Sequence, residues 1–305
     1  MANFYGQYIG FGSSGAGSVD LRFGLTYGYS SGGNRNGMSN IIDYFPIAAT
    51  TGAVDWGDLS VARNSIIGSS GPTHGYSSGG QSGSTQLDVI DRFPWASNAG
   101  SADIGDLTLA RGESPGGSQS QTHGYMHGGN TTDRIDRYGF AATFTATDVG
   151  NLTDACAGIG GYSSLTHGYS IGGNTNLTRI DKYSHVASAD ASDVANLWTG
   201  TTSGSNGMQS LTHGYAFGGH VGYYMDTIQK NNYITDADGT DVGNLSTTGN
   251  STNGCSGVTT GFSMGGGNAS GTRGIESVSF ASDGDSVDHG ALTGSNITGV
   301  AGHEH

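Results

Sequence analysis

Short apolar segments alternate with polar clusters along the whole chain. Residues 169–171 (Tyr-Ser-Ile) and 215–217 (Tyr-Ala-Phe) place apolar and polar side chains in turn, with a period of two. This period is typical of β-strands, in which successive side chains point to opposite faces. Clusters of Gly, Ser, Asn and Asp follow at intervals of roughly ten residues, as turns do. No segment has a sustained helical stripe, so the pattern predicts an all-β protein of many short strands.

One motif, Thr-His-Gly-Tyr followed by Gly-Gly, recurs along the chain. The Gly-Gly pairs begin at residues 32, 79, 128, 172, 218 and 265, so the repeat is about 46 residues long. Four complete copies contain the histidines His74, His123, His167 and His213. Two degenerate copies have Tyr27 and Thr260 at the histidine position. Self-similarity at this period predicts one structural module in six copies.

Two further motifs lie at a constant distance from each other. Ile-Asp-Arg-aromatic begins at Ile42, Ile90, Ile135 and Ile180, with weaker copies at Ile228 and Ile275. Asp-Val-Gly-Asp-Leu begins at Asp55, Asp103, Asp148, Asp193, Asp241 and Asp288. The first Asp of this motif stands 12 residues after the acidic position of the other in all six copies. The fixed spacing predicts two strands and a defined turn, whereas the variable distance from Gly-Gly to Ile predicts a surface loop.

The repeat predicts a ring of stacked blades. A module of this size supplies about four strands and cannot cover its own faces, so neighbouring modules must stack. We therefore expect residues 21–305 to form one six-bladed β-propeller. Residues 293–302 are expected to supply the innermost strand of the blade begun by residues 25–33, which latches the ring and removes exposed edges. The Gly-Gly pairs are expected where strands crowd the axis, and residues 1–20 are expected to form an arm or a plug.

Composition narrows the classes of partner. The net charge is −14 with only 11 Lys and Arg, which argues against a nucleic-acid footprint and against an anionic membrane surface. No stretch approaches the roughly 18 apolar residues of a membrane span. The N-terminus has no basic segment followed by an apolar one, so we expect no signal peptide. Cys156 and Cys255 occupy different places in their repeats and are expected to be separate buried thiols.

The motif order resembles kelch-type propeller repeats. The best example is Leu-Thr-Leu-Ala-Arg at residues 107–111, followed by Gly-Gly at 128–129 and Ile-Asp-Arg-Tyr at 135–138. The usual kelch tryptophan is absent or displaced. The full set of motifs is similar to kelch-like repeats in virion proteins of marine tailed bacteriophages, cyanophages especially. The resemblance covers about residues 25–300 and implies a virion location, with other virion proteins as partners, contacted by residues 1–20 in one reading.

Two patterns suggest metal ligands. The four repeated histidines could surround an axis, but two of the six copies lack them, and we expect each histidine to bond the backbone of a neighbouring blade instead. Asp236, Asp238 and Asp241 are spaced like part of a calcium loop, although the distal Glu of an EF-hand is missing. We expect solvated turn acids there, and the repeated Asp103 and Asp148 are expected to accept backbone N–H bonds. The sequence thus predicts no cofactor, with calcium as the alternative.

Three functions remain open. No nucleophile elbow, phosphate-binding glycine loop or sialidase-type Asp box is present. With the acidic, Gly/Ser-rich surface, this absence favours a non-enzymatic protein, and the resemblance of the repeat implies a virion structural protein in a tail, fibre, baseplate or capsid accessory position, which is the leading hypothesis. The second is a module that binds host-surface glycans, with His220, Tyr223 and Tyr224 extending one loop. The third is a polysaccharide-degrading enzyme, with no pair of carboxylates that stands out as an acid/base couple.

Overall fold

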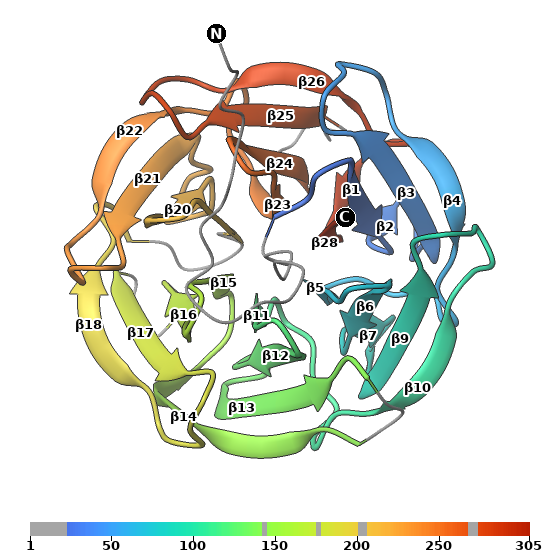
Figure 1. Cartoon of the computed structure of the whole chain (residues 1–305), viewed down its shortest axis with the longest axis horizontal. Helices are drawn as coiled ribbons and strands as arrows, with labels where there is room; N and C mark the ends of the chain where they lie inside the picture. The colour runs from blue at the N-terminus through green and yellow to red at the C-terminus, as the bar shows by residue number, and fades with distance from the viewer. Residues whose placement is uncertain (1–22, 142–144, 175–177, 201–205, 268–273) are drawn as a thin grey trace, which may run out of the picture.

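The computed structural model is a six-bladed β-propeller, and the residues that it describes form no helix (Figure 1). It describes residues 23–141, 145–174, 178–200, 206–267 and 274–305. The expected all-β fold and the six blades are confirmed. Residues 1–20, expected to be an arm or plug, lie outside the described residues. In the described part of the chain no helix is long and apolar enough to cross a membrane.

Each blade is a four-stranded antiparallel sheet, and we name its strands inner, second, third and outer from the axis outward. In that order, the first three blades are β28 (Ala301–Glu304), β1 (Tyr27–Ser31), β3 (Ile41–Pro46) and β4 (Val54–Asp58); β5 (Ile67–Ser70), β6 (His74–Ser78), β9 (Val89–Pro94) and β10 (Ala102–Asp106); and β11 (Gly116–Gln119), β12 (His123–His127), β13 (Thr132–Gly139) and β14 (Thr147–Cys156).

The other three blades repeat the same order around the ring. They are β15 (Gly160–Ser163), β16 (His167–Ile171), β17 (Arg179–Ser184) and β18 (Ser192–Asn196); β19 (Asn206–Gln209), β20 (His213–Phe217), β21 (Thr227–Asn232) and β22 (Thr240–Asn244); and β23 (Asn250–Ser256), β24 (Thr260–Gly267), β25 (Gly274–Ser279) and β26 (Val287–Ala291). Two-stranded ribbons join β2 (Asn34–Arg35) to β27 (Ile297–Thr298), and β7 (Gln81–Ser82) to β8 (Thr85–Gln86).

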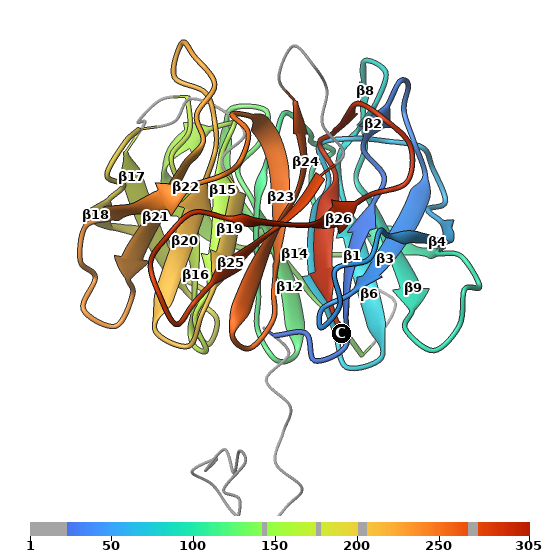
Figure 2. The same cartoon turned by 90° about the horizontal axis from the view of Figure 1, so that it is seen from above.

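The antiparallel strand order gives the ring two different faces (Figure 2). Turns between inner and second strands, and between third and outer strands, lie on one side, which we call the turn face. Loops between second and third strands, and the connections between blades, lie on the other side, which we call the loop face. The C-terminus lies on the turn face, at the bottom of Figure 2.

The chain closes the ring by noncovalent strand pairing. β28 pairs with β1 in antiparallel register, with Ala301 opposite Ser31 and Glu304 opposite Gly28. In Figure 1 the last strand lies beside the first in one blade. The predicted latch is confirmed, but its position was wrong: the inner strand is residues 301–304, not 293–302. Residues 297–298 pair with β2 instead, and Thr293 bonds Asp43, so the earlier segment is used as a connection.

The constant interval of 12 residues corresponds to a single hairpin. In the register between third and outer strands, Asp91 lies opposite Asp103 and Asp136 opposite Asp148. The same two positions face each other in the other four blades. A β-bulge follows the outer-strand Asp, whose side chain accepts the N–H two residues on, at 3.1 Å from Gly105 N in blade 2. The expected backbone acceptor role of Asp103 and Asp148 is confirmed.

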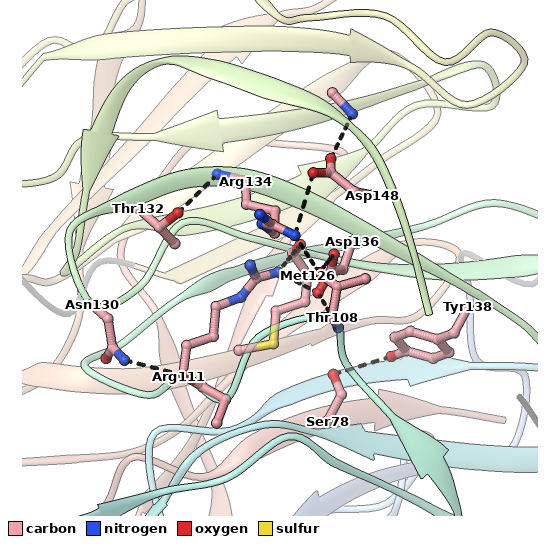
Figure 3. A network of polar contacts seen from close by, with 12 residues as sticks. Ser78, Thr108, Arg111, Met126, Asn130, Thr132, Arg134, Asp136, Tyr138 and Asp148 are labelled. Atoms are coloured by element: carbon pink, nitrogen blue, oxygen red, sulfur yellow. Dashed lines mark hydrogen bonds and ion pairs between the residues drawn. The ribbon is translucent and has the colours of Figure 1, made fainter. Parts of the chain in front are cut away.

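The third-strand acid clamps the connection that arrives from the preceding blade (Figure 3). Thr108 follows the outer strand of blade 2, and its N–H and hydroxyl donate to the carboxylate of Asp136 in blade 3, at 3.0 and 2.6 Å. The guanidinium of Arg111 is fully buried, 3.3 Å from the same carboxylate, and donates to the carbonyl of Met126 at 2.8 Å. Buried charges are tolerated only when paired in this way. Corresponding carboxylate or amide oxygens bond the connection in every other blade.

Glycine has two distinct roles in this ring. The Gly-Gly pairs end the second strands in turns with positive φ, as at Gly79 (61°) and Gly80 (98°), where a side chain would be strained. Our expectation that these pairs allow close approach at the axis was therefore wrong. Close approach at the axis is instead allowed by a glycine that stands two residues before the end of each inner strand. It occurs in all six blades, at Gly68, Gly117, Gly161, Gly207, Gly254 and Gly302.

Candidate functional site

The repeated histidines lie on the turn face, each at the start of a second strand. In all four complete motifs Nδ1 lies within hydrogen-bond distance of the preceding threonine hydroxyl, 2.7 Å in the Thr73–His74 pair. The expectation that they bond a neighbouring blade's backbone was wrong, because the partner adjacent in sequence is closer. The described residues contain no group of three or more His, Cys, Asp or Glu arranged to hold a metal ion.

A basic side chain accompanies each of these histidines. Tyr76 lies opposite Arg92 in the register of blade 2, and Tyr125 lies opposite Arg137 in blade 3. Lysines occupy the same position in blades 4 and 5. Burial lowers the pKa of all four histidines, and the neighbouring cation lowers it further. These imidazoles are therefore neutral near pH 7, with an edge available for hydrogen bonding.

The basic positions differ between blades in how they are neutralised. Lys182 of blade 4 contacts both carboxylate oxygens of Asp236 in blade 5, at 2.9 Å. Lys230 of blade 5 pairs in the same way with Asp283 of blade 6. Within the described ranges, neither Arg92 nor Arg137 forms an ion pair with a carboxylate. Among the described residues, Arg92 and Arg137 thus keep a positive charge that no carboxylate pairs, in a protein with a net charge of −14.

The calcium candidates do not converge on a common point. Asp236 binds Lys182, Asp238 accepts the N–H of Asn196 at 2.8 Å, and Asp241 accepts that of Gly243 at 3.2 Å. Each carboxylate thus has a different structural partner, in the described part of the chain. The two cysteines, Cys156 and Cys255, are free and buried, as expected.

The aromatic loop candidate is formed as a tight hairpin on the loop face of blade 5. His220 and Tyr224 form an isolated antiparallel bridge, and their rings meet edge to face with centroids 5.1 Å apart. Gly222 at the tip has a φ of 85°. Tyr223 is 65% exposed and Tyr224 is 41% exposed, so the hairpin presents two large aromatic side chains to solvent. Aromatic rings held in this way can stack on apolar faces of a ligand.

Sequence reasoning missed a ring of polar side chains around the axis. They stand at the last position of the inner strands and bond from blade to blade: Gln119 N–H donates to Ser163 Oγ at 2.8 Å, and Gln209 N–H to Ser256 Oγ at 2.9 Å. Gln119 Nε2 also donates to Glu304 Oε1 at 2.7 Å. The members of this axial ring are Ser70, Gln119, Ser163, Gln209, Ser256 and Glu304.

The side chains of the axial ring fill most of the space around the propeller axis, so they do not form a binding site for an organic ligand. The space beside the axial ring is about 50 Å³, which suits water-sized occupants rather than an organic ligand. Each long side chain in the axial ring alternates with a serine, so six strands converge without leaving a wide pore. The inner strands, which carry the axial ring, can be found in the sequence by a glycine that stands six residues before each His-Gly-Tyr motif, as Gly117 does before His123.

A scan against protein-family models finds no match to this chain, and a search of curated proteins finds no similar sequence.

Proposed function

We propose that this protein is a non-enzymatic structural component of a phage virion, in which the propeller is a rigid interaction scaffold. The resemblance of its repeat to kelch-like virion proteins supports the location. Rigidity is supported by the closed strand pairing and by the clamp that ties each connection to the next blade. Residues 1–20, outside the described residues, are the proposed additional contact with other virion proteins.

The observation that carries the scaffold role is the exposure of apolar side chains at repeated places on the turn face. Leu25, Leu165 and Leu211 stand directly before the threonine of the second-strand motif and are 63%, 57% and 46% exposed. Val186 and Ile234 occupy the neighbouring turns between third and outer strands and are also exposed. Apolar groups gathered on one side of a soluble protein are typical of protein–protein contact surfaces.

Changing the turn-face leucines should separate assembly from folding. We expect the double variant Leu165→Ser and Leu211→Ser to fold normally, because both side chains are exposed, and to be lost from purified virions. Quantitative mass spectrometry of particles, with immunogold labelling, measures its incorporation. Leu109→Ser is the matched control, since Leu109 is exposed in a connection on the loop face. A wild-type chain found only as a free monomer, absent from any particle, contradicts the proposal.

A second candidate function is glycan binding by the hairpin of His220, Tyr223 and Tyr224. The two exposed tyrosines favour it, because aromatic faces stack on the C–H surfaces of sugar rings. Tyr223→Ala should abolish binding on a glycan array without changing the unfolding transition. Ile234→Ala, which changes an exposed residue on the other face, should bind as the wild type does. The absence of wild-type binding at millimolar sugar concentration removes this candidate.

A further inference from the structure

Blade 3 has a hollow on its turn face that is open to solvent. Its volume is about 390 Å³. It is lined by His123 and Arg137, by Tyr138, Gly139 and Ala141, and by the hydroxyl-bearing residues Thr122, Thr145 and Thr147. Spaces of this size hold small organic ligands, with a few polar groups fixing orientation.

The residue opposite His123 has no side chain, which leaves the imidazole uncovered on the side of the hollow. In the strand register His123 faces Gly139, whereas His74 faces Pro94 and His167 faces Ser184. The remaining three blades have Pro46, Asn232 and Ser279 at this place. A Cβ built on Gly139 would lie 3.9 Å from Nε2 and Cδ2 of His123. The imidazole edge that carries Nε2 therefore borders the open space, while Nδ1 is engaged by Thr122 Oγ1 at 2.7 Å.

The charge of Arg137 is not neutralised as those of Lys182 and Lys230 are. The acids that pair with Lys182 and Lys230 stand five residues before the outer-strand Asp of the following blade, at Asp236 and Asp283. In the blade that follows Arg137, the same position is Ser188. The substitution leaves a guanidinium on the wall of the hollow without a carboxylate partner among the described residues.

The chemistry of the lining selects a class of ligand. A guanidinium has a planar fork of donors that matches a carboxylate in bidentate geometry, which a lysine ammonium cannot reproduce. The neutral imidazole and the threonine hydroxyls offer several hydrogen-bonding groups suited to alcohols. A sugar ring that carries a carboxylate would bond both the guanidinium, through its carboxylate, and the imidazole and threonine hydroxyls, through its own hydroxyl groups. Such a ring fits the volume of the hollow.

We propose that this hollow is a binding site for a carboxylate-bearing sugar, with the carboxylate on Arg137 and ring hydroxyls on His123 and Thr147. The site is independent of the scaffold role, and it lies on the opposite face from the hairpin of Tyr223 and Tyr224. Acidic peptides could also supply a carboxylate, but extended chains make less use of three threonine hydroxyls in a hollow confined to one blade.

The test uses the full chain with sodium D-glucuronate as the probe, and with D-glucose and sodium acetate as its neutral and non-sugar counterparts. Saturation-transfer NMR and calorimetric titration should detect millimolar binding of glucuronate. Binding of glucose and of acetate should be weaker by about tenfold or more, because each lacks one half of the recognition.

Variants locate the site. Arg137→Gln removes the charge and should lower glucuronate affinity by about tenfold or more. Gly139→Phe places an aromatic ring in the hollow beside His123, and should block the site and abolish binding. Since a Cβ at Gly139 makes only ordinary contacts, this variant is expected to fold, which its unfolding transition verifies. Lys182→Gln is the matched control, because it changes the equivalent residue of blade 4, and it should leave binding unchanged.

Several results would overturn the proposal. They are undetectable glucuronate binding to the wild type, unchanged binding to folded Gly139→Phe, and acetate binding as tightly as glucuronate. Loss of binding only in Tyr223→Ala would assign the sugar to the loop-face hairpin instead. Tighter binding of a glutamate-rich peptide than of glucuronate, lost in Arg137→Gln, would identify a peptide site.

Discussion

Replacing Gly207 by alanine is expected to destabilise the protein by about 3 kcal/mol or more, or to prevent the ring from closing. A Cβ at this position would lie 2.2 Å from the carbonyl oxygen of Gly161 in the next inner strand. The Cα that would carry this Cβ and the carbonyl of Gly161 both belong to the backbone of paired strands, so neither can move aside as a flexible side chain would. The midpoint of urea unfolding measures the effect.

Gly274→Ala is the matched control for this substitution. Gly274 also lies in a strand, its φ is not positive, and an added Cβ would meet no atom within 4 Å. We expect its unfolding free energy to stay within about 0.5 kcal/mol of the wild type. If Gly207→Ala unfolds at the same urea concentration as Gly274→Ala, the close contact between inner strands does not require glycine, and our account of the axis glycines is wrong.

Acid should destabilise the fold well before its carboxylates are protonated, because two buried histidines resist protonation. Burial lowers the pKa of His127 to about 3 and that of His303 to about 4. His127 Nδ1 lies 3.0 Å from the hydroxyl of Tyr183, and His303 Nε2 lies 2.9 Å from Ser31 Oγ. The unfolded chain binds protons below about pH 6.5, while the folded chain does not, so falling pH favours unfolding.

The expected slope follows from this linkage. Each histidine contributes about 1.4 kcal/mol of lost stability per pH unit, fully retained above about pH 6.5 and lost progressively toward about pH 4. Urea unfolding measured from about pH 7 to about pH 4.5 should show it. The double variant His127→Asn and His303→Asn should be less stable at neutral pH but have a shallower dependence. An equal slope in both proteins would mean that other groups control the acid transition.

The sequence predicted those parts of the fold in which two motifs at a constant spacing lie in the same hairpin. The interval from Asp91 to Asp103 stays constant because the two residues face each other across one turn. An inserted residue between them would shift the pairing of the third and outer strands and disrupt the β-bulge. The loop after each Gly-Gly tolerates changes of length, since it lies at the surface of the loop face.

Partnerships between distant residues could not be predicted in the same way. Arg111 was part of the kelch-like motif, yet its ion pair with Asp136 depends on how the connection packs against the next blade. The inner strands share little besides glycine, and a glycine is easily overlooked in a chain that has 57 of them. Its constant place six residues before the His-Gly-Tyr motif would have identified it.

The candidate site was predicted only in part. Histidines that recur in each blade invited a symmetric explanation, such as a shared ligand or a shared structural bond. The distinguishing features of blade 3 are two departures from the repeat, Gly139 and Ser188, and a search for similarity passes over departures. His220, Tyr223 and Tyr224 were expected to extend one loop, and the structure places them in a hairpin in which Tyr223 and Tyr224 are exposed.

The place of β28 in blade 1 also determines when that blade can be finished during synthesis. β1 is made early, and its inner edge stays unpaired until residues 301–304 leave the ribosome, after all the other blades have been translated. An unpaired edge is open to pairing with other chains. Ribosomes that translate the same message stand close together, so the nascent chains on one polysome are the nearest wrong partners. Blade 1 is consequently where slow translation, or early termination, would most favour association between chains.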